Sequence, residues 1–123
     1  MTKILNIALF TFCITLMTAC ANENHEKVVG DWQGFSWIVE GKESNNNAAA
    51  VTFSFSSENQ YEGSWGNKTE KGVFRMDGNK LYTTEDGKLE KMVKIEFLGS
   101  DTLVFHMNRM GTEEHLFLTR SKK

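Results

Sequence analysis

The sequence predicts an all-β domain in which eight antiparallel strands form an up-and-down barrel. Apolar and polar residues alternate along the chain after residue 28, as in strands that bury one face. Turn signals interrupt this alternation at intervals of about 8–12 residues, which is typical of sandwiches and barrels. The 123 residues, of which 40% are hydrophobic, suffice for one globular domain. A net charge of −2 argues against a nucleic-acid partner, which needs a clustered basic surface.

Residues 1–19 are expected to form a signal peptide, because Lys3 precedes an apolar run from Ile4 to Met17. This run is too short to span a bilayer comfortably. It ends in Leu16-Met17-Thr18-Ala19-Cys20, which resembles the lipobox that bacterial signal peptidase II cleaves before the cysteine. The resemblance implies that Cys20 becomes the first residue and carries a diacylglycerol and an N-acyl chain such as palmitate. The alternative is an ordinary signal peptide followed by an incidental cysteine.

Cysteine usage supports lipidation. Of the two cysteines, Cys13 lies in the segment that cleavage removes. With Cys20 acylated, the mature protein has no free thiol, disulfide or cysteine-based metal site. Because two or more acyl chains anchor a protein stably, we expect it in a bacterial cell envelope, in the outer membrane and facing the periplasm or the surface. Residues 20–28 then form a lipidated tether, whose acidic residues resemble surface-export signals of some Bacteroidetes lipoproteins. A solvated linker is the simpler interpretation.

Residues 29–121 form the expected barrel domain. Turns are expected where Asn, Asp and Gly gather, as at 77–78 and 86–87, because these residues supply the positive φ of tight hairpins. The longest connection, 41–47, is expected to be a flexible loop. Between the turns, the pattern predicts strands at 29–40, 48–56, 60–66, 70–76, 79–85, 88–98, 102–108 and 112–120.

The turn positions predict the register between neighbouring strands. They place in opposition Phe55 and Tyr61, Phe53 and Gly63, Val51 and Trp65, Tyr61 and Phe74, Gly63 and Gly72, Phe74 and Leu81, Phe97 and Leu103, and Ile95 and Phe105. One face then collects the large apolar side chains Phe53, Phe55, Tyr61, Trp65, Phe74, Met76, Leu81, Val93, Ile95, Phe97, Leu103 and Phe105. A slip of one residue would turn a strand's apolar set to the opposite face, so the agreement across several turns supports the assignment.

A single apolar face on sequential antiparallel strands must be buried. Closing the sheet on itself buries that face and removes the strand edges, which favours a barrel. A two-sheet sandwich is the alternative. Strand 29–40 departs from the pattern, because Trp32 and Trp37 fall on opposite faces of a regular strand, and a bulge near Gly34 would reconcile them.

Both ends of the domain carry a recognisable motif. Gly30-Asp31-Trp32 matches the Gly-x-Trp motif that opens lipocalin barrels, and the segment 116–120 ends in Arg120. Residues 29–121 resemble the small lipocalin-like domains of Bacteroidetes lipoproteins, without the C-terminal helix and disulfide of full lipocalins. The resemblance implies that Arg120 packs over Trp32 near the closed end. Such a cation–π contact would tie the first strand to the last, so we interpret Gly30, Trp32 and Arg120 as structural.

The sequence offers no catalytic constellation. It contains no Gly-x-Ser-x-Gly elbow and no glycine-rich phosphate loop. His106 and His115 lie on adjacent predicted strands, but two histidines without a third ligand do not make a zinc site. The acidic pair Glu113-Glu114 lies at a turn, where solvation is the ordinary explanation. We therefore expect no enzymatic activity, no metal and no cofactor.

Two functions remain open. In the first, the protein binds a small apolar ligand in the barrel mouth between Tyr61, Trp65 and Phe74. In the second, the barrel is the scaffold of a protein-interaction or inhibitor module. An eight-stranded barrel holds its own side chains or one small ligand, so many large inward residues predict a shallow cavity. Gly63 facing Gly72 would leave a gap, either a bend that closes the barrel or the floor of a small pocket.

Overall fold

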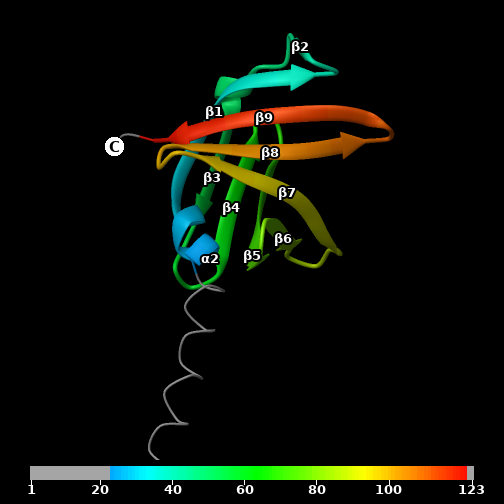
Figure 1. The fold of residues 1–123 in the computed structure, drawn as a ribbon. Coiled ribbons are helices and arrows are strands. Elements are labelled where there is room, and N and C mark those ends of the chain that lie inside the picture. The colour runs from blue at the N-terminus through cyan, green and yellow to red at the C-terminus, as the bar shows by residue number, and fades with distance from the viewer. Residues whose placement is uncertain (1–22, 122–123) are drawn as a thin grey trace, which may run out of the picture.

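The computed structural model describes residues 23–121. Within them, eight strands form a closed antiparallel barrel (Figure 1). Each strand pairs with the next, and the first pairs with the last. The strands are β1 (Gly30–Val39), β3 (Val51–Phe55), β4 (Gln60–Trp65), β5 (Thr69–Asp77), β6 (Lys80–Glu85), β7 (Glu90–Leu98), β8 (Thr102–Arg109) and β9 (Thr112–Arg120). The predicted all-β barrel is confirmed, and the β1–β9 pairing excludes the two-sheet sandwich. The signal peptide and Cys20 lie outside the described residues.

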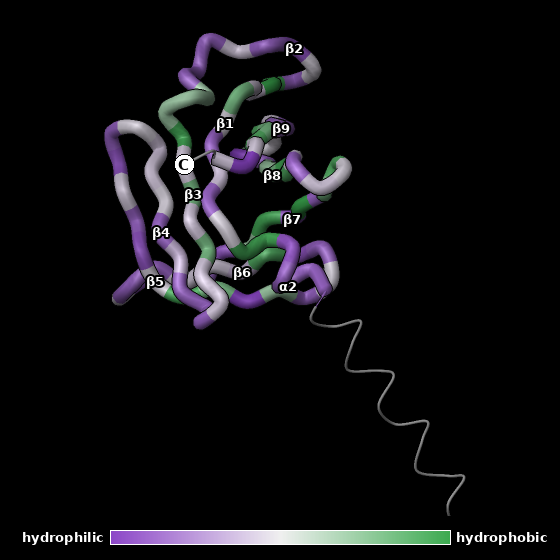
Figure 2. The backbone as a smooth tube through the Cα atoms, turned by 90° about the vertical axis from the view of Figure 1, so that its left-hand side faces the viewer, coloured by the Kyte–Doolittle hydropathy of each residue, from purple (hydrophilic) through white to green (hydrophobic). Residues whose placement is uncertain are grey.

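Three short elements accompany the barrel: the helix α2 (Glu23–Val28), the strand β2 (Lys42–Glu43) and the 3₁₀ turn η1 (Ala48–Ala50). From Glu23 onward, the expected polar linker is therefore a helix. Its acidic residues lie in the first turn and its basic residues in the last, as the helix dipole favours. Val28 at its end is fully buried. The helix and the loop around β2 are largely hydrophilic (Figure 2). The helix therefore has no periodic apolar pattern from which the sequence could predict it.

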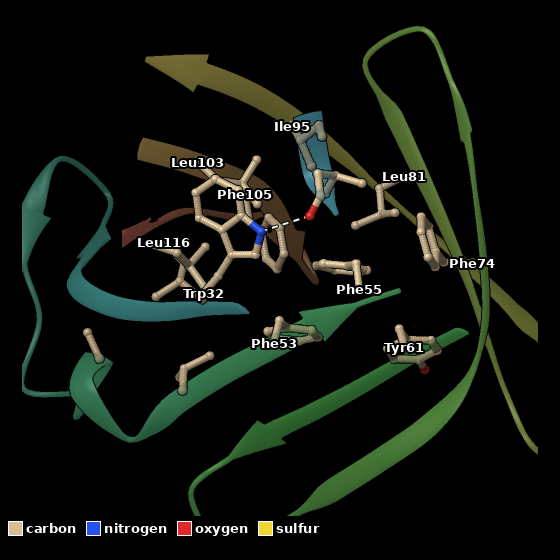
Figure 3. Packing of buried hydrophobic residues seen from close by; sticks show 14 of the residues in the cluster. Trp32, Phe53, Phe55, Tyr61, Phe74, Leu81, Ile95, Leu103, Phe105 and Leu116 are labelled. Carbon is tan, nitrogen blue, oxygen red and sulfur yellow. Dashed lines mark hydrogen bonds between the residues drawn. The ribbon is translucent and has the colours of Figure 1, made fainter. Parts of the chain in front are cut away.

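The apolar face predicted from the sequence forms the core. All of its twelve side chains are buried or packed against the buried cluster. Phe53 and Phe105 meet in this core (Figure 3), with their rings edge-on and 5.3 Å apart between centroids. The Phe53 ring is also edge-on to that of Trp65 at the same centroid distance. Outward positions such as Lys71 and Lys94 are exposed. The alternation of the sequence thus assigned the correct face to the strands from β3 to β8.

The predicted register is confirmed for two hairpins and shifted in two others. Phe55 faces Tyr61 in β3–β4, and Phe97 faces Leu103 in β7–β8, as expected. In β4–β5 the turn lies one residue earlier than the expected 67–68, and in β5–β6 it lies one residue later than the expected 77–78. Each change moves every strand partner by two residues. The turns are centred on Gly66-Asn67 and Gly78-Asn79, where both glycines adopt positive φ. A two-residue shift preserves the face, so the core assignment was unaffected.

The shift removes the expected opposition of Gly63 and Gly72. Gly63 faces Glu70, while Gly72 faces Tyr61. No pocket floor forms at Gly63, because the Phe53 ring covers it: a Cβ there would lie 2.6 Å from Phe53 Cε1. At Gly72 a Cβ would collide with the Thr84 backbone carbonyl of the neighbouring strand. The glycine therefore permits a close approach of two backbones.

The bulge expected in β1 is present. The pairing with β9 shifts register between Gly34 and Ser36. As a result Trp32 and Trp37 both point inward, with 0% and 8% of their surface exposed, whereas Phe35 lies outside. Gly34 at the bulge contacts η1 so closely that a Cβ would collide with the Ala48 carbonyl oxygen. The predicted strand 48–56 therefore begins only at Val51.

The two ends of the barrel differ. At one end α2 covers the opening: Asn24 Nδ2 donates to the Gly78 carbonyl at 2.7 Å, and the His25 ring stacks on Phe74 with centroids 5.2 Å apart (Figure 1). We call this the closed end. Because alternate turns lie at opposite ends, the turns at 66–68, 86–89 and 109–111 surround the other, open end. No helix in residues 23–121 has the length and apolar character needed to cross a bilayer.

Candidate functional site

A hollow of about 600 Å³ lies at the open end of the barrel. This volume is within the range of about 300–1,000 Å³ that is typical of small-molecule sites. Its wall is formed by inward-facing aromatic side chains on three neighbouring strands and on β8, namely Trp37, Phe53, Trp65 and Phe105. Two other depressions, of about 540 and 650 Å³, are lined largely by outward residues such as Lys71 and Lys94. The hollow inside the barrel is therefore the candidate site.

Two indoles form one corner of the hollow. The rings of Trp37 and Trp65 lie 5.9 Å apart between centroids and are tilted by 54°. Trp37 reaches this position because of the β1 bulge, and Trp65 because it is the last residue of β4. Trp65 also packs edge-on against Phe53, which supports it from below. The corner is thus an apolar surface held by the core.

A buried carboxylate lies behind this corner. Glu114 is 6% exposed and accepts a hydrogen bond of 2.9 Å from Trp37 Nε1. Arg109 Nε lies 3.4 Å from Glu114 Oε2, while the arginine side chain remains 54% exposed. The Arg109 guanidinium also lies 5.6 Å from the ring centroids of both Trp37 and Trp65. Arg109 therefore covers the indoles and the carboxylate from the solvent side.

A second buried carboxylate lines the hollow. The Glu70 side chain is 3% exposed and lies 3.2 Å from Lys91 Nζ, whose own side chain is 53% exposed. The Tyr61 hydroxyl donates to Glu70 Oε1 at 3.2 Å. Burial raises the pKa of the Tyr61 hydroxyl, and the adjacent Glu70 carboxylate raises it further. Both buried carboxylates therefore have hydrogen-bond partners, and each is paired with an exposed cation at the hollow.

Only one of the three candidate ligand-binding residues reaches the hollow. Trp65 lines it, whereas Tyr61 and Phe74 are 2% and 3% exposed within the core. Phe74 lies toward the closed end under His25. The reason is position along the strand: β4 runs toward the open end, so its last inward residue is at the mouth and Tyr61 is deep.

Several residues of the hollow were missed from the sequence, and a signal existed for two of them. Glu114 is in phase with Leu116 and Leu118, and Glu70 is in phase with Phe74, so alternation places both carboxylates inside. Glu114 was instead interpreted as a solvated turn residue. No local sequence pattern predicts that each of these carboxylates pairs with a cation from another strand.

The motif residues Gly30, Trp32 and Arg120 come together at the closed end. Arg120 lies opposite Trp32 in the β1–β9 pairing, with its guanidinium 4.3 Å from the indole centroid. It donates to the carbonyls of Lys27, Val29 and Ser100 at 2.8, 3.1 and 3.1 Å. Gly30 leaves room for this group, since a Cβ would lie 2.7 Å from Arg120 Nη1. The contacts join β1, β9, α2 and the β7–β8 turn.

The two histidines lie outside the hollow's charged corner. His106 and His115 are direct partners in β8–β9, with rings edge-on at 4.8 Å. Each approaches a carboxylate, Glu96 at 3.1 Å and Glu113 at 3.4 Å. Among residues 23–121, no three His, Cys, Asp or Glu side chains gather as a set of metal ligands.

Comparison with known proteins agrees with this architecture. The lipocalin-like domain family matches residues 28–105 of the chain. The protein belongs to this family. The lipocalin-like barrel also resembles the crystal structure of a DUF4847-family protein from Bacteroides vulgatus, with 12% sequence identity and a TM-score of 0.54, covering 81% of this chain and 98% of that chain. That likeness concerns the fold alone. No curated protein matches the sequence.

Proposed function

We propose that this lipocalin-like protein is a lipid-anchored envelope protein that binds a small, largely apolar ligand at the open end of its barrel. The hollow of about 600 Å³ with its aromatic wall carries the proposal. The family supports it, because a lipocalin-like barrel is a scaffold of the ligand-binding type. The proposal assigns no enzymatic activity, metal or cofactor.

The proposed anchor would lie at the opposite end of the domain from the hollow. Cys20 precedes the first residue of α2 by three positions, and three residues reach at most about 11 Å. Since α2 covers the closed end, acyl chains on Cys20 would hold that end near the bilayer. The open end would then face away from the membrane, and the ligand would enter from the aqueous side.

A neutral fluorescent probe tests ligand binding. N-phenyl-1-naphthylamine is titrated into the domain and its emission followed. We expect Trp65→Ala to weaken binding by about tenfold, because a large aromatic contact is lost. Phe35→Ala is the matched control, since this aromatic ring lies outside the barrel and is 54% exposed. Equal affinities for wild type and Trp65→Ala, with circular dichroism unchanged, would place the ligand elsewhere.

A fractionation experiment tests the anchor. We expect Cys20→Ala to move the protein from the membrane to the soluble fraction of its host. Mass spectrometry of the wild-type N-terminal peptide should show an acylated Cys20. Protease treatment of intact cells then distinguishes a surface-facing from a periplasm-facing protein. Unchanged partitioning together with an unmodified cysteine contradicts lipidation.

Exposed apolar side chains at the open end favour a second function, that of a protein-interaction module. Leu89 and Met110 lie at the tips of two hairpins and are 89% and 105% exposed. Apolar loop tips of this kind suit contact with another protein. Under this function, a stoichiometric host protein should cross-link to the wild type and not to a Leu89→Ser/Met110→Ser variant, while the neutral probe fails to bind either.

A further inference from the structure

The Arg109 guanidinium occupies a corner whose chemistry is that of a cation site. It faces the indoles of Trp37 and Trp65 at 5.6 Å from each centroid, and Glu114 behind them is 6% exposed. Aromatic faces attract cations through their quadrupole, and ammonium ligands are recognised by such aromatic surfaces. The Glu114 carboxylate supplies the opposite charge. The protein's own arginine thus shows which kind of group the corner accommodates.

The buried charges in and behind the wall of the hollow are negative, while the positive charges around it are exposed. Glu114 and Glu70 have side chains only 8% and 3% exposed. Their partners Arg109 and Lys91 have side chains 54% and 53% exposed, on long stems that extend to solvent. Lys68 at the rim is exposed as well, where water and salt screen it. A cationic head that displaces Arg109 therefore meets the Glu114 carboxylate.

We propose that the hollow selects amphipathic organic cations, such as alkylamines or quaternary ammonium compounds, whose cationic head replaces Arg109 between Trp37 and Trp65. The apolar body then lies against Phe53 and Phe105. Arg109 competes for the same place and so limits the affinity. An anionic head that took the place of Arg109 in this corner would meet the Glu114 carboxylate and be repelled. The proposal rests on the proposed function, because it specifies the ligand of the same hollow.

Three probes that differ in head-group charge test the selection. Dodecyltrimethylammonium, dodecanoate and the neutral N-phenyl-1-naphthylamine are compared below micellar concentrations, the first two by displacement of the third. We expect the wild type to bind the cation at least about tenfold more tightly than the anion. Arg109→Ala should tighten cation binding by about tenfold and change the neutral probe by less than about twofold.

Two further variants separate charge from folding. Glu114→Gln keeps an acceptor for Trp37 Nε1 and removes the charge, so cation binding should weaken by about tenfold. If this variant leaves Arg109 unpaired and unfolds, Arg109→Ala/Glu114→Gln removes both charges and should bind the neutral probe without cation preference. Arg75→Ala is the matched control, because Arg75 lies over Tyr82 at 3.8 Å outside the barrel. It should leave all three affinities unchanged.

The outcomes are distinct. If dodecanoate binds more tightly than the cation and Arg109→Ala weakens it, the hollow is an anion site and the inference is overturned, while the proposed function stands. If cation affinity is the same in the wild type, Arg109→Ala and the double variant, the corner is not the head-group site. If none of the three probes binds the folded wild type, the proposed function fails together with the inference.

Discussion

The contact between Trp32 and Arg120 should be a measurable link between the first and last strands. The perturbation is a double-mutant cycle of Trp32→Leu and Arg120→Met, which keeps apolar volume but removes the indole and the guanidinium. Trp32 is fully buried, and Arg120 lies 4.3 Å from its ring centroid. The cycle isolates the free energy that the two groups share.

The magnitudes follow from the contacts. Trp32→Leu leaves a cavity and removes the 2.8 Å bond from Trp32 Nε1 to the Val28 carbonyl, at a cost of about 2–4 kcal/mol. Arg120→Met loses three hydrogen bonds to backbone carbonyls at partly exposed positions, at a cost of about 2–4 kcal/mol. The coupling should be about 0.5–2 kcal/mol, the range of a cation–π contact.

Urea unfolding of the four proteins measures the coupling. Domains of this kind are stable by about 5–15 kcal/mol, so all four are measured in the same concentration of trimethylamine N-oxide, which keeps the double variant folded. Trp32→Leu combined with Arg75→Met is the control, because Arg75 lies outside over Tyr82. If the losses caused by Trp32→Leu and Arg120→Met add to within about 0.3–0.5 kcal/mol, as those of the control pair should, the proposed link is refuted.

Two further predictions concern the core. Gly72→Ala should lower the free energy of unfolding by about 1–3 kcal/mol, because its Cβ would collide with the Thr84 carbonyl, and urea unfolding measures the loss. The second prediction is that the free energy of unfolding falls as the pH rises above 10.0, the pKa of Tyr61 in the unfolded chain. The pKa of Tyr61 is higher in the folded protein, so the unfolded chain loses the hydroxyl proton while the folded protein keeps it. The slope approaches about 1.4 kcal/mol per pH unit well above pH 10, and the total decrease between pH 9 and 11 is about 1.4 kcal/mol. Tyr61→Phe should flatten it in urea unfolding between pH 9 and 11, and an equal slope in both proteins would contradict this.

The fold could be predicted well from the sequence because the prediction depended only on whether a residue occupies an odd or an even position along its strand. Alternation decides which face a side chain takes, and parity survives an error of one residue in the position of a turn. For that reason Phe74 is correctly inside although it faces Thr83 and not Leu81. The exact register depends on which residue adopts positive φ. Gly66 and Gly78 took that conformation, at positions next to the Asn and Asp residues that were expected to mark the turns.

The site was predicted less well because its lining depends on how far each residue lies from the open end of the barrel. It also depends on contacts between residues that are distant in the sequence. Tyr61 and Trp65 share a face of β4, but only Trp65 is next to the open-end turn. The bulge that brings Trp37 inward could be expected, whereas its bond to Glu114, 77 residues away, could not. A carboxylate beside a turn is ordinarily solvated. Here it is buried because it continues the inward series of β9.

The barrel has an arginine over tryptophan at each end, and the two arrangements differ in how the arginine is held. At the closed end three backbone carbonyls from different segments fix Arg120, and Gly30 clears space for it. At the open end Arg109, beside a hairpin tip, is held through one carboxylate and stays farther from the indoles. The Arg120 guanidinium, fixed by backbone acceptors, cannot leave without losing three hydrogen bonds that join α2, the start of β1 and the β7–β8 turn. A guanidinium held by a single side chain can move to solvent with no backbone contact to break, provided that the ligand which replaces it offers Glu114 another positive charge.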